Sequence, residues 1–138
     1  MLYPFHAAYP VGELENTIYF YQTVLGCKKG RSDTTWVDFD LFGHQLVFHK
    51  VTGFRQQHYF NPVDKHNVPV PHFGVVLAWN DWQPFVERLS KHAISFEIAP
   101  HIRFKGKPGE QATMFFYDPN QYALEFKSFR SLEMLFQT

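Results

Sequence analysis

Three side chains in apolar, strand-like segments are candidates for holding a divalent metal. His6 and His72 each open such a segment, the second running over residues 70–77, and Glu125 lies inside the segment over 122–129. A carboxylate among apolar neighbours is costly to bury unless something pairs with it. Two imidazoles and one carboxylate, with the remaining metal positions open, form the facial triad typical of non-haem Fe(II) sites. The residue types therefore predict a metal site.

An internal repeat supports this grouping of residues. Residues 37–48 can be laid over residues 115–126 without a gap, and His6 and His72 then open the two copies. A duplicated module that cannot bury its sheet face alone is expected to pair with its twin. In this register Glu125 corresponds to Val47, so we expect three ligands and one apolar position. A lone histidine at a strand start is more often structural, but independent core histidines need not fall at equivalent places.

The repeat predicts the elements that position these residues. In a first module over about residues 3–51 we expect a strand over 2–11, a helix over 13–25, and strands over 27–31, 34–40 and 45–51. A connecting loop or lid is expected over 52–69. In a second module over about 70–129 we expect a strand over 70–78, a helix over 81–91, and strands over 94–99, 113–117 and 122–129, followed by a surface tail over 130–138.

The two predicted helices have apolar faces at helical spacing. The first face consists of Leu14, Ile18, Tyr21 and Leu25; the second consists of Trp82, Phe85, Val86 and Leu89, with Asn80 as the expected N-cap. Strands and helices in this order predict an α+β fold. We expect a single domain over residues 1–138, in which two paired βαβββ modules form a curved mixed sheet, or cup.

Other polar residues could complete a site. His49 alternates with Val47, so it should share the metal's side of its strand and could act as a base or orient a ligand. Tyr117 could offer a hydroxyl group in catalysis. Arg103 and Lys105, in a basic loop, could bind a carboxylate or phosphonate of the substrate, although a solvated loop is the equal alternative.

Composition narrows the classes of partner. The chain has 138 residues with 13 basic and 13 acidic side chains, so no overall charge favours nucleic acid. It has no apolar run long enough to span a membrane and no secretory signal pattern. Cys27 is the only cysteine, which fits a reducing cytoplasm. The 16 phenylalanines suit a cavity for a planar small molecule.

The chain resembles the vicinal-oxygen-chelate superfamily, which includes glyoxalase I, fosfomycin-resistance thiol transferases, bleomycin-binding proteins and extradiol dioxygenases. The resemblance covers about residues 3–129. The motifs that carry it are His6, the helix over 14–21 ending at Leu25-Gly26, His72, and Asp118-Pro119 leading to Glu125. It implies paired βαβββ modules with His6, His72 and Glu125 as metal ligands. Residues 36–45 and 103–111 look like those of a group described as predicted extradiol-type dioxygenases.

Departures from the family patterns keep several functions open. Val47 stands where glyoxalase I supplies a glutamate ligand, and Phe115 stands where extradiol dioxygenases carry a tyrosine. The resemblance implies a dioxygenase of catechol-like molecules with Fe(II) as the first choice of metal. The alternatives are a glyoxalase-like lyase or thiol transferase using Mn²⁺, Zn²⁺ or Ni²⁺, and a metal-free, ligand-sequestering protein. We expect a homodimer, in which the modules pair within one chain or exchange between chains, so that His6 comes from a neighbour.

Overall fold

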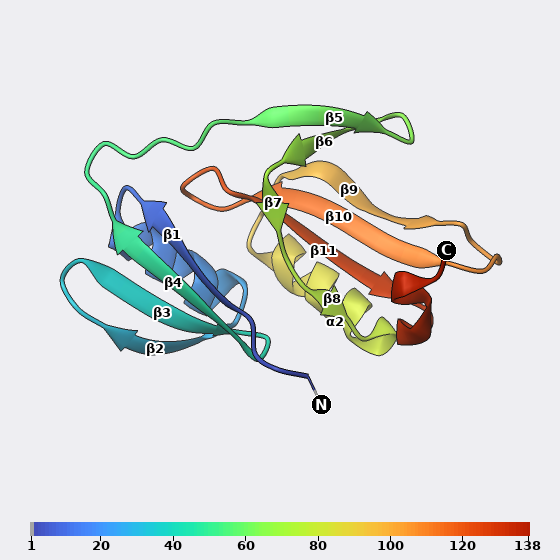
Figure 1. Cartoon of the computed structure of the whole chain (residues 1–138), viewed down its shortest axis with the longest axis horizontal. Coiled ribbons are helices and arrows are strands. Elements are labelled where there is room, and N and C mark those ends of the chain that lie inside the picture. Colours follow the sequence, from blue (N-terminus) through green and yellow to red (C-terminus); the bar gives the residue numbers. More distant parts are fainter. Residues whose placement is uncertain (1) are drawn as a thin grey trace. The chain divides into compact units, whose positions relative to one another are not determined.

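The computed structural model describes residues 2–138, which form two compact units (Figure 1). Unit 1 contains the chain up to Gln57 together with Asp118–Gln121, and unit 2 contains His58–Tyr117 with Tyr122–Thr138. Each unit combines a sheet with helical segments, so the predicted α+β class is confirmed. The finer prediction of one domain made of two modules stays a prediction, and each unit is described by itself below.

Unit 1 is built on a four-stranded mixed sheet. Its strands are β1 (His6–Val11), β2 (Lys28–Ser32), β3 (Trp36–Leu41) and β4 (His44–Lys50). Their order in the sheet is β1-β4-β3-β2, with β1 parallel to β4 and the other neighbours antiparallel. A short helix α1 (Leu14–Ile18) continues directly into a π-helix, η1 (Tyr19–Val24). This is the predicted strand, helix and three strands.

The π-helical turn changes the face that the first helix buries. Tyr21 is fully buried against Phe39 and Phe48, with ring centroids 5.4 and 4.7 Å away. Leu14 and Ile18, however, are only half-buried. The residues that unit 1 buries on this segment are Thr17, Phe20, Tyr21, Val24 and Leu25. The predicted face was therefore partly wrong, because a π-helix bonds i to i+5 and its wider turns shift the spacing away from 3.6 residues.

The turn Asp118–Gln121 belongs to unit 1 through buried polar contacts. The Tyr21 hydroxyl donates to Asp118 Oδ2 at 2.9 Å, and Asp118 is only 2% exposed. Asn120 Oδ1 accepts the Gly12 backbone N–H at 3.1 Å, and Asn120 Nδ2 donates to Thr17 Oγ1 at 2.8 Å. A buried carboxylate is tolerated only when its oxygens have such partners. These bonds fix the turn against the helical segment.

Unit 2 contains the remaining strands and the longer helix. Its elements are β5 (Tyr59–Val63), β6 (His66–Val70), β7 (His72–Phe73), β8 (Val76–Leu77), α2 (Trp79–Lys91), β9 (Phe96–Arg103), β10 (Gln111–Tyr117), β11 (Ala123–Phe129) and the 3₁₀ helix η2 (Leu132–Phe136). The main sheet has the order β7-β11-β10-β9, β8 also pairs with β11, and β5 and β6 form a separate hairpin.

The unit 2 sheet has two faces of different chemistry. Helix α2 packs on one face (Figure 1). On that face the Phe126 ring lies 4.6 Å from Phe85 and 5.8 Å from Phe116, centroid to centroid. Because side chains alternate along a strand, Glu125 and Lys127 on β11 must point to the opposite face. The helix therefore closes the core on one side and leaves the other face for a site.

The segment predicted as a loop over residues 52–69 is partly a β-hairpin. Strands β5 and β6 pair antiparallel, with Val63 opposite His66. The two residues between them, Asp64 and Lys65, both adopt a positive φ, 47° and 66°. Two consecutive left-handed residues make the type I′ turn that suits hairpins. The prediction of a loop was wrong here because the usual Asn-Gly or Asp-Gly signal is absent.

The strand predicted over residues 70–78 is interrupted. Within this segment only β7 and β8 pair with β11, and they lie on either side of Gly74 and Val75. A Cβ atom on Gly74 would lie 1.5 Å from the carbonyl oxygen of Glu125. Only glycine allows the two backbones to approach this closely. The interruption thus sits directly beside the predicted carboxylate ligand.

Two further element boundaries differ from those predicted. Helix α2 begins at Trp79 with Ala78 in the N-cap position, so Asn80 lies inside the helix and does not cap it. Pro84 consequently lies in the second turn of the helix. Strand β9 continues to Arg103, whereas the sequence predicted its end near residue 99. The buried face of α2, with Trp82, Phe85 and Leu89 buried, was predicted correctly.

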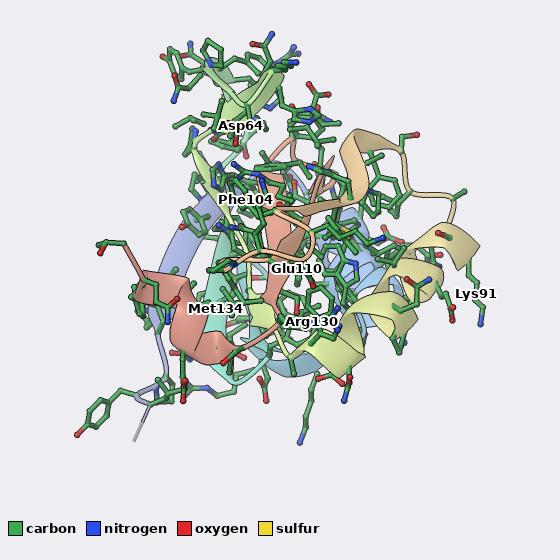
Figure 2. The ribbon with its side chains drawn as sticks, turned by 90° about the vertical axis from the view of Figure 1, so that its right-hand side faces the viewer. Asp64, Lys91, Phe104, Glu110, Arg130 and Met134 are labelled. Carbon is green, nitrogen blue, oxygen red and sulfur yellow. The ribbon has the colours of Figure 1, made fainter. Side chains whose placement is uncertain are left out.

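An ionic cluster anchors the loop after β9 and the end of β11. Arg130 Nε lies 2.8 Å from Glu110 Oε2 (Figure 2). The guanidinium group of Arg130 also stacks over the Trp79 ring at 4.5 Å. Glu110 Oε1 accepts the Gly106 N–H at 2.7 Å. The Gly106 hydrogen bond and the Arg130 partner lower the pKa of Glu110. Hydrogen bonds and an ion pair to Glu110 therefore hold the basic loop in place.

None of the helices that residues 2–138 form combines the length and the apolarity that crossing a membrane requires.

We expect Tyr21→Phe to lower the free energy of unfolding by about 1 to 3 kcal/mol, because it removes a hydrogen bond from a buried carboxylate. Urea unfolding followed by circular dichroism measures this loss. Tyr19→Phe is the matched control, since Tyr19 is 58% exposed. Equal stabilities of the two variants would show that the Tyr21–Asp118 bond contributes nothing.

Candidate metal and substrate site

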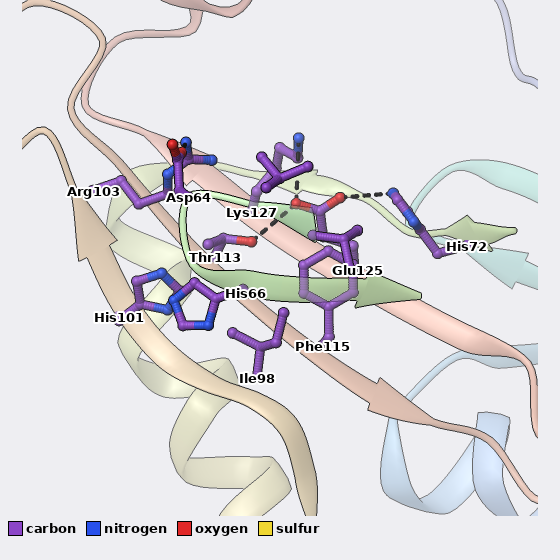
Figure 3. Close-up of a pocket in the computed structure, with 12 residues that line it drawn as sticks. Asp64, His66, His72, Ile98, His101, Arg103, Thr113, Phe115, Glu125 and Lys127 are labelled. Atoms are coloured by element: carbon purple, nitrogen blue, oxygen red, sulfur yellow. Dashed lines mark hydrogen bonds and ion pairs between the residues drawn. The ribbon is translucent and has the colours of Figure 1, made fainter. Parts of the chain in front are cut away.

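Two of the three predicted metal ligands meet on the open face of the unit 2 sheet. Strand β7 runs parallel to β11, with His72 opposite Ala123, two residues before Glu125. His72 Nε2 lies 2.9 Å from Glu125 Oε2 (Figure 3). The close approach at Gly74 lets β7 lie against β11 at this point. The structure thus brings the side chains of His72 and Glu125 into contact.

Neighbouring groups orient both side chains. His72 Nδ1 lies 2.7 Å from the Pro69 carbonyl, which can only accept a hydrogen bond, so Nδ1 carries the proton and Nε2 faces Glu125. Glu125 Oε1 accepts a hydrogen bond from Thr113 Oγ1 at 2.9 Å and lies 3.3 Å from Lys127 Nζ. Outer partners of this kind are what hold metal ligands in place.

The electrostatics of the pair favour its charged form. The hydrogen bond that His72 donates to the Glu125 carboxylate raises the pKa of His72 above its ordinary value of 6.5, against the effect of burial, and the Pro69 carbonyl adds to the rise. Burial works to raise the pKa of Glu125, but His72, Lys127 and Thr113 together hold it below its ordinary value of 4.5. Near neutral pH, Glu125 is therefore a carboxylate ready to accept a cation.

The geometry of the pair fits a divalent metal. Two ligands bonded at 2.0–2.1 Å and at right angles around one metal ion lie about 3 Å apart. His72 Nε2 and Glu125 Oε2 are separated by 2.9 Å. The proton shared between them occupies the lone-pair directions that a metal would use, so proton and metal compete. Imidazole and carboxylate together suit Fe(II), Zn²⁺, Mn²⁺ or Ni²⁺.

His6 lies in unit 1, at the start of β1, and a series of side-chain hydrogen bonds orients it. Its Nδ1 lies 2.8 Å from Gln45 Oε1, and Gln45 Nε2 donates to Asp38 Oδ2 at 3.2 Å. Asp38 is buried and accepts the Arg31 backbone N–H at 2.5 Å. The amide oxygen of Gln45 accepts, so His6 carries its proton on Nδ1 and presents Nε2 outward. This is the tautomer that a metal ligand needs.

No group of three or more His, Cys, Asp or Glu side chains is gathered as a metal cluster within residues 2–138. The pair His72–Glu125 is observed, whereas the addition of His6 to it stays a prediction.

The sequence also predicted His49 and Tyr117 as catalytic residues. His49 is exposed on β4 and shares the strand face of Gln45 and Val47, as its alternation predicted. Tyr117 ends β10, and its ring stacks on His58 at 4.8 Å. Burial, followed by the charge of Glu97, raises the pKa of Tyr117. Its hydroxyl therefore stays protonated and could donate a hydrogen bond. The catalytic roles of both residues stay predictions.

A pocket of about 260 Å³ lies next to the His72–Glu125 pair, within unit 2 (Figure 3). Strands β9, β10 and β11 provide its floor and the β5–β6 hairpin provides one wall. The lining residues are Val63, Asp64, His66, Val68, His72, Ile98, His101, Arg103, Thr113, Phe115, Glu125 and Lys127. The segment predicted as a connecting loop or lid therefore supplies part of the candidate site.

The predicted substrate-binding residues have different positions. Arg103 lines the pocket from the end of β9 and forms an ion pair with Asp64 of the hairpin turn. Lys105 is exposed and is not among the lining residues, so its role stays a prediction. Sequence reasoning missed His66 and His101. The alternation of His101 with Arg103 was a usable signal for His101, but it required the knowledge that β9 extends this far.

Comparisons with known proteins identify the family. A model of the glyoxalase/bleomycin resistance protein/dioxygenase superfamily matches residues 4–126. The chain belongs to this superfamily. A comparison with curated protein sequences gives no match. The vicinal-oxygen-chelate resemblance of the sequence is thereby confirmed at the level of the superfamily, and its extradiol-type subgroup stays a proposal.

Solved structures of the superfamily share the fold over nearly the whole chain. A glyoxalase/bleomycin resistance protein/dioxygenase from Alicyclobacillus acidocaldarius has 29% sequence identity and a TM-score of 0.78, with 96% of each chain covered. The fosfomycin resistance protein FosX from Listeria monocytogenes has 17% identity and a TM-score of 0.70, covering 97% of this chain and 98% of that one. A glyoxalase/dioxygenase from Nostoc punctiforme has 16% identity and a TM-score of 0.69, with 91% and 90% covered.

We expect the stability of the metal-free protein to depend on pH through the His72–Glu125 pair. The raised pKa of His72 contributes stability that is full below 6.5 and is lost as pH rises through the folded-state value. The lowered pKa of Glu125 contributes stability that is full above 4.5 and is lost as pH falls through its folded-state value. The pair therefore stabilises most between about pH 4.5 and 6.5.

Urea unfolding in the presence of a chelator tests this expectation. The loss of stability between pH 6 and pH 9 should be smaller in His72→Gln than in the unchanged protein. His92→Gln, a substitution at the end of α2, is the control and should keep the full dependence. An identical alkaline decline in all three proteins would rule out a contribution from the pair.

Proposed function

We propose that this protein is a metal-dependent enzyme that binds a small molecule through two adjacent oxygens, with dioxygenation of a catechol-like substrate as the specific reaction. His6, His72 and Glu125 hold the metal in this proposal. The observation that carries it is the 2.9 Å approach of His72 Nε2 to Glu125 Oε2 at the edge of a pocket, with both side chains oriented by outer partners. Membership of a superfamily that includes dioxygenases supports it.

The metal would supply Lewis acidity toward the two substrate oxygens and, as Fe(II), the redox chemistry of a dioxygenase. The residues of the chain bind and orient. Phe115 and Ile98 offer an apolar wall for a ring. The Lys127 ammonium group, beside Glu125, would stabilise negative charge on a substrate oxygen. His49 would accept the substrate proton, and the Tyr117 hydroxyl would act as a donor.

A second candidate function is metal-free binding of a small ligand. One observation favours it: Glu125 is already paired with His72, Thr113 and Lys127, so its charge is satisfied by protein groups alone. A cation beside the carboxylate also competes with a metal for it. Elemental analysis of the purified protein separates the two functions, since a sequestering protein would contain no stoichiometric metal.

We expect His72→Ala and Glu125→Gln each to weaken metal binding by more than the roughly 10- to 100-fold loss that removal of an outer partner causes. Removing a direct ligand leaves the metal with too few donors. Calorimetric titration with Mn²⁺ or Zn²⁺ measures the change, and His92→Ala is the matched control. Unchanged affinity in both variants would contradict the proposed site.

His6→Ala tests the third ligand in the same titration and should lose affinity to a similar degree. If His6 comes from a partner chain in a homodimer, an unfolded and refolded equal mixture of His6→Ala and His72→Ala should regain about one quarter of the sites. If His6 comes from the same chain, the mixture should regain none. Full affinity of His6→Ala alone would remove His6 from the proposal.

We expect protein loaded anaerobically with Fe(II) to convert a catechol to a yellow ring-opened product when oxygen is admitted. The absorbance of the product and the uptake of oxygen measure the reaction. Glu125→Gln is the negative control and should reduce the rate by at least the loss expected for metal binding. Absence of turnover across a broad catechol panel would contradict the dioxygenase assignment while leaving metal binding intact.

A further inference from the structure

A second pocket lies next to the tail of unit 2 and has a volume of about 400 Å³. The basic loop after β9, the start of β10, the end of β11 and the tail with η2 all contribute to its lining. We call it the tail pocket, and we call the pocket beside the His72–Glu125 pair the Glu125 pocket. The apolar residues that line the tail pocket are Phe104, Pro108, Phe129, Met134 and Leu135.

The two pockets are neighbours on the open face of the unit 2 sheet. Side chains alternate along a strand, so Glu125, Lys127 and Phe129 follow one another on the same face of β11. Glu125 lines the Glu125 pocket, Phe129 lines the tail pocket, and Lys127 lines both. Residues two apart on a strand are separated by about 7 Å. A ligand that passes Lys127 therefore reaches the tail pocket within a few bond lengths.

The boundary between the pockets presents apolar surface. Lys127 directs its charge into the Glu125 pocket, because its Nζ lies 3.3 Å from Glu125 Oε1. The methylene groups of a lysine offer apolar contact area when its charged end is held elsewhere. Arg103 of the Glu125 pocket lies over the ring of Phe104, a residue of the tail pocket, at 5.0 Å. Both cationic side chains are thus engaged where the pockets meet.

The hairpin limits the Glu125 pocket in the other direction. His66 of β6 and His101 of β9 have ring centroids 5.1 Å apart, so the two rings are in contact (Figure 3). Asp64 of the hairpin turn forms its ion pair with Arg103 of β9. These contacts join the hairpin to the sheet. A ligand that outgrows the Glu125 pocket therefore meets less obstruction past Lys127 than toward the hairpin.

The chemistry of the tail pocket favours an apolar group. Among the residues that line it, Lys127 is the only one with a charged side chain, and that charge is directed toward Glu125. Phe104 is 50% exposed, and Met134 and Leu135 are half-buried. Covering such apolar surface with an apolar ligand is favourable in proportion to the area removed from water.

We propose that the tail pocket is a subsite for an alkyl arm on the ring of the substrate. This inference rests on the proposed function, because it assigns the part of the same substrate that the metal does not hold. The Glu125 pocket, at about 260 Å³, is smaller than sites for drug-sized ligands and takes about one ring. The arm leaves that ring, passes the Lys127 methylene groups and lies against Phe129 and Leu135.

Calorimetry with Zn²⁺-loaded protein tests the subsite. The probes are 4-methylcatechol, 4-ethylcatechol and 4-butylcatechol. We expect affinity to rise about 3-fold for each added methylene group that is buried. Leu135→Asp places a charge in the tail pocket and should remove this gain. Leu132→Asp, a substitution at a 59% exposed position of the same short helix outside the lining, is the matched control and should preserve the gain. An equal gain in all three proteins would contradict the subsite.

A second measurement needs neither a variant nor a metal. 1-Hexanol added to the chelator-treated protein should shift the Cε methyl resonance of Met134 in NMR spectra. Met114, which is fully buried in the core, is the internal control and should keep its resonance. A shift of Met134 in a protein that binds no metal or catechol would support the subsite while contradicting the proposed function. Equal affinity of Zn²⁺-loaded protein for all three catechols, with no shift of Met134, would overturn the subsite and leave the proposed function standing.

Discussion

The burial of one carboxylate governs the open face of unit 2. Glu125 lies in the middle of a strand whose next neighbours, Leu124 and Phe126, are buried in the core. An unpaired charge could not remain at such a position, because its desolvation would cost more than the strand contributes. The chain supplies an imidazole, a hydroxyl and an ammonium group around it. Each of these partners comes from β7, β10 or β11, so the sheet register and the charge balance depend on each other.

The same sheet shows how one element serves packing and chemistry at once. Helix α2 covers the face of Phe116 and Phe126, and this aromatic layer packs the helix against the strands. Because side chains alternate along a strand, Thr113, Glu125 and Lys127 then lie on the other face. Rigid strands hold ligands more accurately than loops do. The glycine at position 74 completes the arrangement, because it lets the strand that carries His72 approach the backbone of Glu125.

Unit 1 uses polar contacts differently. Its carboxylates accept hydrogen bonds that hold other parts of the unit in place. Asp118 accepts a hydrogen bond from the Tyr21 hydroxyl, and Asp38 accepts one from Gln45, which is itself bonded to His6. The π-helix places Tyr21 over the sheet so that its hydroxyl can reach Asp118. A segment of the chain nearly a hundred residues away is thereby fixed against the first helix. The histidine that opens β1 is oriented by an exposed hydrogen bond to Gln45, which is itself bonded to the buried Asp38.

Periodicity and duplication explain what could be predicted from the amino-acid sequence alone. The α+β class, the order of strands and helices in each half and the buried face of α2 follow from spacing along the chain, and the internal repeat nominated His72 and Glu125 as candidate ligands. Local signals failed where the chain departs from common turn chemistry, as at Asp64-Lys65, where two left-handed residues form a hairpin turn without glycine. Local sequence signals also failed to predict the π-helix η1, because the pattern of apolar residues does not indicate where the helical turns become wider.

The tertiary structure decided the partners of the charged groups and the contents of the pocket. Only the folded sheet shows that Lys127 and Thr113 share Glu125 with His72, and that Arg103 is bound to Asp64 rather than free for a ligand. The pairing of His66 with His101 depends on a hairpin and a strand that are distant in sequence. The physical reason is that spacing specifies which side of its own strand a residue faces, whereas contacts between strands depend on register, bulges and turns. The sequence by itself therefore determined the candidate ligands and the folding class, and the three-dimensional arrangement determined which groups balance their charge.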